Sequence, residues 1–270
     1  MGLGISFLIL FVLALAATQS GFRRLVHFIS VGYAAAITLM ALAAAVMFWR
    51  GLDLWAALHL ALLFGWGLRL WVFLRRREAA PGYQKELAEM DVQYGGIKTP
   101  ARLGIWVGVS ALYGLMFLPG LLDAAASRQL AGTMVWLRAA GMLISAGGIV
   151  LETAADRQKS RYKTAHPRSF CSAGLYRWVR CPNYLGEILF WVGSWVMGIP
   201  FYSNLLAWAA SLFGLVCIVL IMMGSTKRLE RAQGERYGHL PEYQNYVRSV
   251  PVLFPWTHIY TLQGVKVYLE

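Results

Sequence analysis

Charged, amide and aromatic side chains that could bind a polar ligand gather in the second half of the chain. The first group follows an apolar stretch and reads ADRQKSRYK over residues 155–163. If the preceding helix continues, Asp156, Lys159 and Lys163 share one of its faces, because residues three and four apart are neighbours on a helix. The lysines could pair with phosphates, and the carboxylate could bind ribose hydroxyls or orient an arginine. A helix at the membrane surface whose cations meet anionic lipid also fits this run, but it gives Asp156 no role.

The second group reads GLYRWVRCPNYLGEI and ends inside the sixth apolar stretch. Pro182 favours a helix start, since its missing N–H costs nothing in a first turn. Asn183 and Glu187 then share a face near the start of an apolar helix, where an acid is costly unless it faces a polar cavity. A bound ligand is one interpretation of this pair. In the other, Asn183 caps the helix and Glu187 forms an ion pair with Arg177 or Arg180.

The third group lies in the C-terminal tail, where basic residues and tyrosines alternate between residues 227 and 251. Such a mixture could surround a nucleotide, with rings stacking on the base and cations pairing with phosphates. An amphipathic helix resting on the membrane fits the tail equally well. The ligand candidates in the tail are Tyr243, Tyr246 and Arg248.

Arg69 is a single cation inside the third apolar stretch of the chain, near residues 53–74. Its long side chain can extend to the membrane surface and leave only its methylene groups in the hydrocarbon. Alternatively it points into the same cavity as the groups above and meets an anionic part of the ligand. The sequence leaves both interpretations open.

Familiar nucleotide and metal motifs are missing from the sequence. No GxGxxG lies between a strand and a helix and no P-loop pattern occurs, so neither a Rossmann domain nor a P-loop is expected. The three cysteines, Cys171, Cys181 and Cys217, form no CxxC pattern, and no HxxxH is present. We therefore expect no metal site and no structural disulfide. A nucleotide would have to be held by helix ends and side chains of the membrane domain.

The composition indicates that a membrane surrounds most of this chain. Of its 270 residues 58% are hydrophobic and 14% are charged, and the mean hydropathy is +0.53, whereas soluble domains carry more charge. Because about 20 apolar residues cross the hydrocarbon core, we expect an all-α polytopic membrane protein with about seven transmembrane helices and a cytoplasmic cofactor cavity. The expected spans lie near residues 3–19, 27–49, 53–74, 102–121, 132–151, 183–200 and 203–223.

The lysine and arginine residues are distributed unevenly among the loops. Nearly all of the 25 follow the first, third and fifth spans or lie in the tail, whereas the opposite side holds Arg50, Arg128 and Arg138. By the positive-inside rule, the N-terminus is expected outside and the C-terminus in the cytoplasm. Much of the net charge of +12 therefore sets topology, and no nucleic acid partner is expected.

Polarity also divides the chain along its length. Residues 1–74 are expected to form an apolar half of three helices on the substrate side, and residues 75–256 to carry the cofactor site. Within the latter, residues 75–101 are expected to form a loop, with Pro81-Gly82 and Gly95-Gly96 as turn signals. Residues 257–270 form a tail to which the sequence assigns no role.

At these motifs the sequence resembles the C-terminal half of the steroid 5α-reductase family. The resemblance covers about residues 60–256 and is closest to the bacterial branch of reductase-like membrane proteins, which implies a bacterial inner membrane. Sterol reductases and isoprenylcysteine carboxyl methyltransferases share the same skeleton. The matching segments are WGLRL at 66–70, ADRQKSRYK at 155–163, GLYRWVRCPNYLGEILFW at 174–191 and RYGHLPEYQNYVRSVPVLFP at 236–255.

The resemblance implies a seven-helix fold with NADPH in a cavity open to the cytoplasm and a flat, lipid-like substrate that enters from the bilayer. The expected partners are therefore a lipophilic small molecule and membrane lipids. Asparagine before Tyr184 is similar to the reductases rather than to the methyltransferase branch. The residues that the resemblance places in or beside the cofactor site are Asp156, Lys163, Arg180, Asn183, Tyr184, Glu187 and Tyr243.

Two features depart from the family pattern. Cys181 stands where most relatives of the bacterial branch have histidine. The acidic pair that the steroid enzymes carry in an early helix has no counterpart in the second span, where Tyr33, Ser30 and Thr38 are the polar groups. Tyr33 is therefore the candidate catalytic donor, and the resemblance does not extend to steroid specificity.

The interpretation that the residues and the resemblance favour is an NADPH-dependent reductase of a conjugated C=C bond. Such a reaction needs hydride delivery to the β-carbon and a donor that stabilises the enolate oxygen. An S-adenosylmethionine-dependent methyltransferase of the isoprenylcysteine carboxyl type is the first alternative, because the tail and residues 182–186 resemble both branches. A non-catalytic membrane binding protein that kept the fold is the second.

Overall fold

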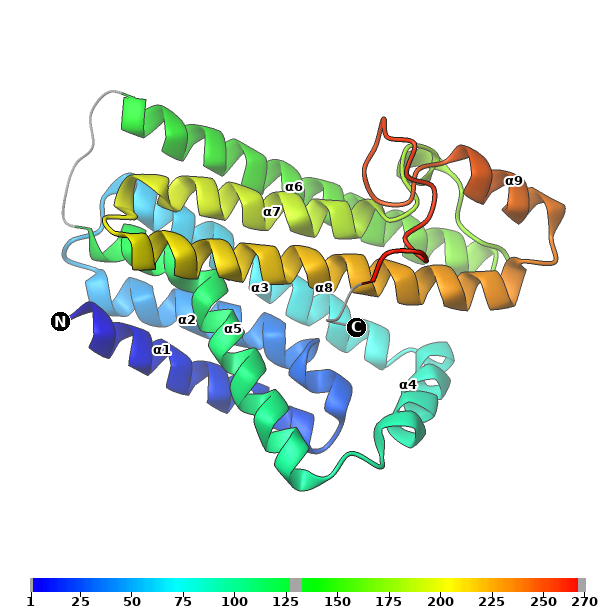
Figure 1. Ribbon diagram of the computed structural model, residues 1–270, viewed down its shortest axis with the longest axis horizontal. Helices are drawn as coiled ribbons and strands as arrows, with labels where there is room; N and C mark the ends of the chain where they lie inside the picture. Colours follow the sequence, from blue (N-terminus) through cyan, green and yellow to red (C-terminus); the bar gives the residue numbers. More distant parts are fainter. Residues whose placement is uncertain (1, 127–132, 267–270) are drawn as a thin grey trace. The chain divides into compact units, whose positions relative to one another are not determined.

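The computed structural model describes residues 2–126 and 133–266, and this part of the chain contains helices but no strands (Figure 1). Seven helical segments are long and apolar enough to cross a membrane, which confirms the expected fold class and number of spans. The long helices are α1 Leu3–Thr18, α2 Val31–Phe48, α3 Leu54–Glu78, α5 Thr99–Ala125, α6 Thr133–Ala165, α7 Pro182–Gly198 and α8 Leu205–Tyr237.

Contacts between Cα atoms divide the chain into two compact units. Unit 1 comprises Met1–Ala140 and Ser194–Gly214, and unit 2 comprises Gly141–Gly193 and Leu215–Glu270. The division falls inside α6, α7 and α8, so each of these helices contributes to both units. The sequence predicted a different division, at residue 74, from the change in polarity along the chain. That division stays a prediction.

In unit 1, α2 forms the centre of the helix packing. It is preceded by two short 3₁₀ helices, η1 Gln19–Phe22 and η2 Leu25–Phe28. Ile37 and Met40 of α2 are fully buried, as are Leu63 of α3 and Phe117 of α5. Gly67 lets α3 approach α2 closely, because a Cβ there would lie 2.9 Å from the carbonyl oxygen of Ala34. Small residues at such crossings are typical of membrane helix pairs.

Residues 75–101 were expected to form a loop, and this expectation is wrong, because they contain helix α4, Pro81–Tyr94. Pro81 and Gly82 suggested a turn, but a proline at the first helical position is compatible with a helix start. The helix is held by Leu87, which is fully buried, and by an ion pair of 3.0 Å between Arg24 Nε and Asp91. Arg77 also donates a hydrogen bond of 3.1 Å to the Tyr83 hydroxyl.

In unit 2, α6 and α7 pack with their backbones in close contact. A Cβ on Gly148 would lie 2.5 Å from the carbonyl oxygen of Gly186, and one on Gly186 would lie 2.6 Å from the backbone nitrogen of Glu152. The Ser145 hydroxyl adds a hydrogen bond of 2.9 Å to the carbonyl of Phe190. Glycines and small polar residues thus fix the spacing of these two helices.

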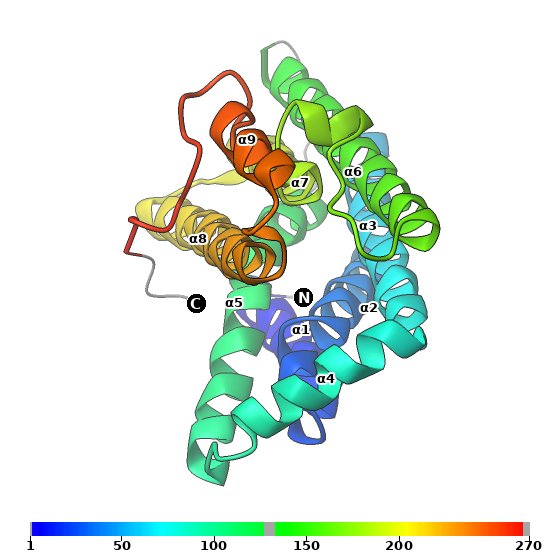
Figure 2. The same ribbon diagram turned by 90° about the vertical axis from the view of Figure 1, so that its right-hand side faces the viewer.

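The remaining elements of unit 2 are the 3₁₀ helix η3 Gly174–Arg177 and the short helix α9 Pro241–Ser249, which turns back beside the end of α8 (Figure 2). Two backbone hydrogen bonds join the segment before α7 to the segment after α9. Arg180 N donates to Pro251 O at 2.9 Å, and Cys181 N donates to Val252 O at 3.1 Å. They position the start of α7 against the C-terminal segment.

Candidate functional site

Most of the ligand candidates belong to unit 2. They come from the end of α6, from the start of α7 with the segment before it, and from α9. These residues are Asp156, Lys159, Lys163, Arg177, Arg180, Asn183, Tyr184, Glu187, Tyr243, Tyr246 and Arg248. Tyr33 and Arg69 belong to unit 1.

The end of α6 carries two faces of different character. The helix continues through residues 155–163, as expected, and ends at Ala165. Asp156 is buried and Lys159 is half-buried, whereas Arg157 and Arg161 are exposed. The expected face of Asp156, Lys159 and Lys163 is therefore the one that packs into the unit.

Lys163 stabilises the loop after α6. Its ammonium donates hydrogen bonds of 3.0 Å to the carbonyls of Pro167 and Ser169, and one of 2.8 Å to the Tyr237 hydroxyl. An ammonium has three donors, so these bonds use all of them. In this arrangement Lys163 holds the loop rather than a phosphate.

Arg180 forms a buried ion pair with Glu230 of α8. Its Nη2 donates to Glu230 Oε1 at 2.8 Å and also to the carbonyl of Tyr260, and the two side chains are only 4% and 8% exposed. The other oxygen of Glu230 accepts a bond of 2.9 Å from Leu262 N. Arg177, the other cation proposed as a partner of Glu187, is exposed.

Asn183 carries the most informative side chain at the start of α7. It is the second residue of the helix, and the residue that precedes the helix is Cys181, so the interpretation of Asn183 as the helix cap is wrong. Its Oδ1 is buried and accepts no hydrogen bond from the described part of the chain. Glu187, four residues on, is also buried. Buried acceptors without a donor are rare in proteins, so this oxygen is a position at which a ligand or a water molecule can donate a hydrogen bond.

Two tyrosines of the tail pack against Phe170, which lies in the loop after α6. Phe170 lies 5.1 Å from Tyr243 and 5.3 Å from Tyr246, measured between ring centroids. The Tyr246 hydroxyl donates to the carbonyl of Tyr176 at 2.7 Å. Burial raises the pKa of both Tyr243 and Tyr246, so their hydroxyls are neutral. These contacts hold α9 against the loop, and stacking on a base stays a prediction.

Cys181, which stands where most relatives of the bacterial branch have histidine, has a buried thiol. Burial raises its pKa to about 11, although the positive charges of Lys159 and Arg180 act in the opposite direction. A thiol with this pKa stays protonated at neutral pH, and only the thiolate is a strong nucleophile. We therefore assign Cys181 no nucleophilic role. Cys171, Cys181 and Cys217 are all free cysteines.

Of the two candidates in unit 1, Tyr33 lies among aromatic rings. Tyr33 is 5% exposed, and its ring stacks on that of Tyr113 with centroids 4.8 Å apart. The ring of Trp66 packs edge-on against that of Tyr33, with centroids 5.3 Å apart. Arg69 is half-buried, with Nε and Nη2 shielded from solvent. A shared site of these residues with those of unit 2 stays a prediction.

Sequence reasoning missed a buried polar network in unit 1. Arg138 binds Asp53 through two parallel hydrogen bonds of 2.7 and 2.8 Å, and it binds Asp123 at 2.6 Å. Asp123 accepts from His59 Nδ1 at 2.9 Å, and His59 Nε2 lies 2.9 Å from the Ser194 hydroxyl. The available signal was a histidine inside an apolar span, since ionisable residues in such segments usually have a specific partner.

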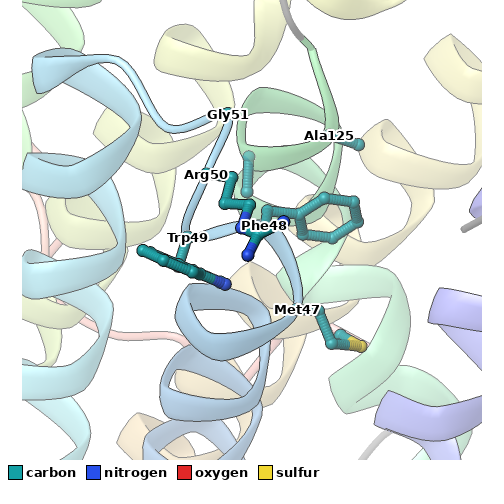
Figure 3. Close-up of a pocket in the computed structure, with 7 residues that line it drawn as sticks. Met47, Phe48, Trp49, Arg50, Gly51 and Ala125 are labelled. Carbon is teal, nitrogen blue, oxygen red and sulfur yellow. The ribbon is translucent and has the colours of Figure 1, made fainter.

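A small cavity of about 220 Å³ in unit 1 contains none of the candidates (Figure 3). It is lined by the end of α2, the following turn with Trp49 and Arg50, and the end of α5. Among the described residues, no group of three histidine, cysteine or acidic side chains could hold a metal ion.

Comparison with known proteins places the chain in a family. The family model described as "Protein of unknown function (DUF1295)" matches residues 17–250. The chain belongs to this family. The membership confirms the resemblance at the level of the steroid 5α-reductase-like proteins in general.

The DUF1295 match is accompanied by a weaker one to a single protein. An uncharacterised protein of Schizosaccharomyces pombe is 32% identical over 39% of this chain and 35% of its own length. The chain thus spans about a third of the curated relative that it matches. No solved structure matches the chain significantly.

Proposed function

We propose that this DUF1295 protein is a membrane-embedded, NADPH-dependent reductase of a conjugated C=C bond in a lipophilic substrate. The observation that carries the proposal is the buried Oδ1 of Asn183, an acceptor without a donor in the described part of the chain. The carboxamide of a nicotinamide both donates and accepts hydrogen bonds, so its NH₂ group would satisfy this oxygen. Glu187, on the same face of α7, offers a second acceptor.

The other candidates fit a dinucleotide that carries phosphates. Asp156 would bind a ribose hydroxyl, and the cations Lys159, Arg177 and Arg248 would pair with phosphates, with Arg69 as a further cation from α3. Bound NADPH supplies the hydride. The chain would orient the cofactor, exclude water from it, and hold the substrate oxygen through the hydroxyl of Tyr33.

The distribution of basic residues supports an orientation for this enzyme. We propose that the N-terminus lies outside and the C-terminus in the cytoplasm of a bacterial inner membrane, because the basic loops would then face the cytoplasm. The cofactor residues at the end of α6 and in the tail would lie on the cytoplasmic side, where NADPH is available. The lipophilic substrate would enter from the bilayer.

Thermal unfolding of the detergent-solubilised protein tests the cofactor class. NADPH is expected to raise the melting temperature more than NADH does, because a ligand that binds the folded state stabilises it and the cations can pair with the 2′-phosphate. Stabilisation by S-adenosylmethionine without any effect of NADPH would favour the methyltransferase alternative. If neither compound changes the melting temperature, the non-catalytic binding protein remains.

The variant Asn183→Ala tests the observation behind the proposal. Loss of one buried hydrogen bond partner costs about 1–3 kcal/mol, so NADPH affinity should fall about tenfold to a hundredfold. Stability without ligand should stay the same or rise, because the substitution removes an acceptor that has no donor. Titration of NADPH into the folded variant and thermal unfolding without ligand measure the two effects.

Asn245→Ala is the matched control, since Asn245 is an exposed asparagine of α9. It should change neither quantity. If Asn183→Ala instead lowers stability and keeps the wild-type affinity for NADPH, Asn183 has a structural role and the proposal loses its main support.

A further inference from the structure

The outward face of α6 in unit 2 leads from apolar residues to arginines. Leu143 and Val150 are 74% and 69% exposed, although both are large and apolar. Arg157 follows Val150 by seven residues, as Val150 follows Leu143, so the three lie on one face of the helix. Arg157 and Arg161 are exposed as well. In a protein with seven apolar spans, the face with Leu143 and Val150 contacts lipid tails, and the arginines continue that face.

The length of α6 places these arginines at the edge of the membrane. The helix has 33 residues, about 50 Å at 1.5 Å per residue, whereas the hydrocarbon core is about 30 Å thick. About 20 residues counted from Thr133 reach Glu152. Arg157 and Arg161 then lie within the next three turns, and their long side chains can reach the lipid headgroups.

An open pocket of about 570 Å³ begins at this depth on α6. Its lining residues are Ala154, Arg157, Gln158, Arg161, Tyr162, Ala165 and His166. Arg157 and Arg161 are four residues apart, so both guanidinium groups can reach a single phosphate. Tyr162 stacks on His166 with ring centroids 4.7 Å apart, and tyrosine is typical of the membrane–water interface. Ala154 and Ala165, with small side chains, flank the two arginines along the helix.

We propose that this pocket binds the phosphate of an anionic phospholipid from the adjoining leaflet. Continuity with the lipid-facing residues favours a lipid over a soluble anion, because the acyl chains would lie along Leu143 and Val150. Charge favours an anionic headgroup, because Asp156 lies on the buried face of the helix and the pocket lining contains no acid. The two faces of α6 thereby serve different ligands, and this proposal does not depend on the cofactor.

Native mass spectrometry of protein released from vesicles with equal parts of phosphatidylcholine and phosphatidylglycerol tests the proposal. The wild type is expected to retain phosphatidylglycerol selectively. Arg157→Gln with Arg161→Gln should lower this selectivity about thirtyfold, since each basic residue near an anionic surface raises affinity roughly fivefold and two of them are removed. Arg157→Lys with Arg161→Lys should retain part of it, because lysine keeps the charge but loses the planar fork.

The matched control is Arg168→Gln with Arg231→Gln, which removes two exposed arginines of unit 2 that do not line the pocket. It should keep wild-type selectivity. Equal losses in both double variants would show that general charge, not this pocket, selects the lipid and would overturn the proposal. Displacement of phosphatidylglycerol by inorganic phosphate, at an ionic strength matched with chloride, would assign the pocket to a soluble anion and overturn it too.

Discussion

Replacement of Arg138 by methionine is expected to destabilise the protein by about 3–5 kcal/mol. The Arg138 side chain is 1% exposed and binds both Asp53 and Asp123, so its removal leaves the buried carboxylate of Asp123 and the half-buried one of Asp53 without their cation. Uncompensated buried charges are far more costly than an intact buried ion pair. Methionine keeps the approximate length of the side chain, so lost charge rather than lost volume dominates. Thermal or denaturant unfolding of the detergent-solubilised variant measures the effect.

Arg50→Met is the control for this prediction. Arg50 is an exposed arginine of unit 1, and its guanidinium lies 5.0 Å from the ring centroid of Trp49. An exposed cation–π contact contributes about 0.5–1 kcal/mol, so the control should lose much less stability than Arg138→Met. Similar stability of the two variants would show that the network of Arg138 does not hold unit 1 together.

The network explains how polar groups stabilise an apolar bundle. Asp53 precedes α3 and caps it through a bond of 2.7 Å from Ala56 N, and Asp123 lies near the end of α5. Arg138 from α6 joins these two acids, and His59 extends the chain of hydrogen bonds to Ser194 of α7. Directional hydrogen bonds therefore link four helices. Contacts between apolar side chains alone do not provide this directionality.

The sequence predicted the membrane spans because each needs only a local property, about 20 apolar residues in a row. It did not predict where α3 and α8 end, since their polar ends continue as helix outside the expected spans. Helix α4 was missed because Pro81 and Gly82 are common in turns as well as in first turns of helices. This helix also contains no run of about 20 apolar residues, the signal that revealed the membrane spans.

The site was predictable only in part. Residue types and their helical spacing can be read from a short segment, whereas the partners of these residues lie far away in the sequence. Helical spacing correctly placed Asp156, Lys159 and Lys163 on one face of α6. The partner of Arg180, by contrast, is Glu230, which lies 50 residues away in sequence. His59 and Ser194 are separated by 135 residues, so no sequence pattern joins them. Long-range partners of this kind depend on helix packing, which composition and periodicity do not determine.

Gly148→Ala in α6 is expected to destabilise unit 2, whereas the same change at the neighbouring Gly147 should not. A Cβ on Gly148 would lie 2.5 Å from both Gly186 O and Phe190 N, and backbone atoms cannot turn away as a side chain can. Overpacking of this kind typically costs about 1–3 kcal/mol, because α6 and α7 must move apart.

Gly147→Ala is a closely matched control, since Gly147 is the adjacent residue of the same helix. It is exposed, and a Cβ there would have no atom within 4 Å. Alanine also favours the helix over glycine by up to about 1 kcal/mol, so Gly147→Ala should leave stability unchanged or raise it. Thermal unfolding of both variants in the same detergent measures the difference. Equal melting temperatures would mean that α6 and α7 do not pack through Gly148 and Gly186.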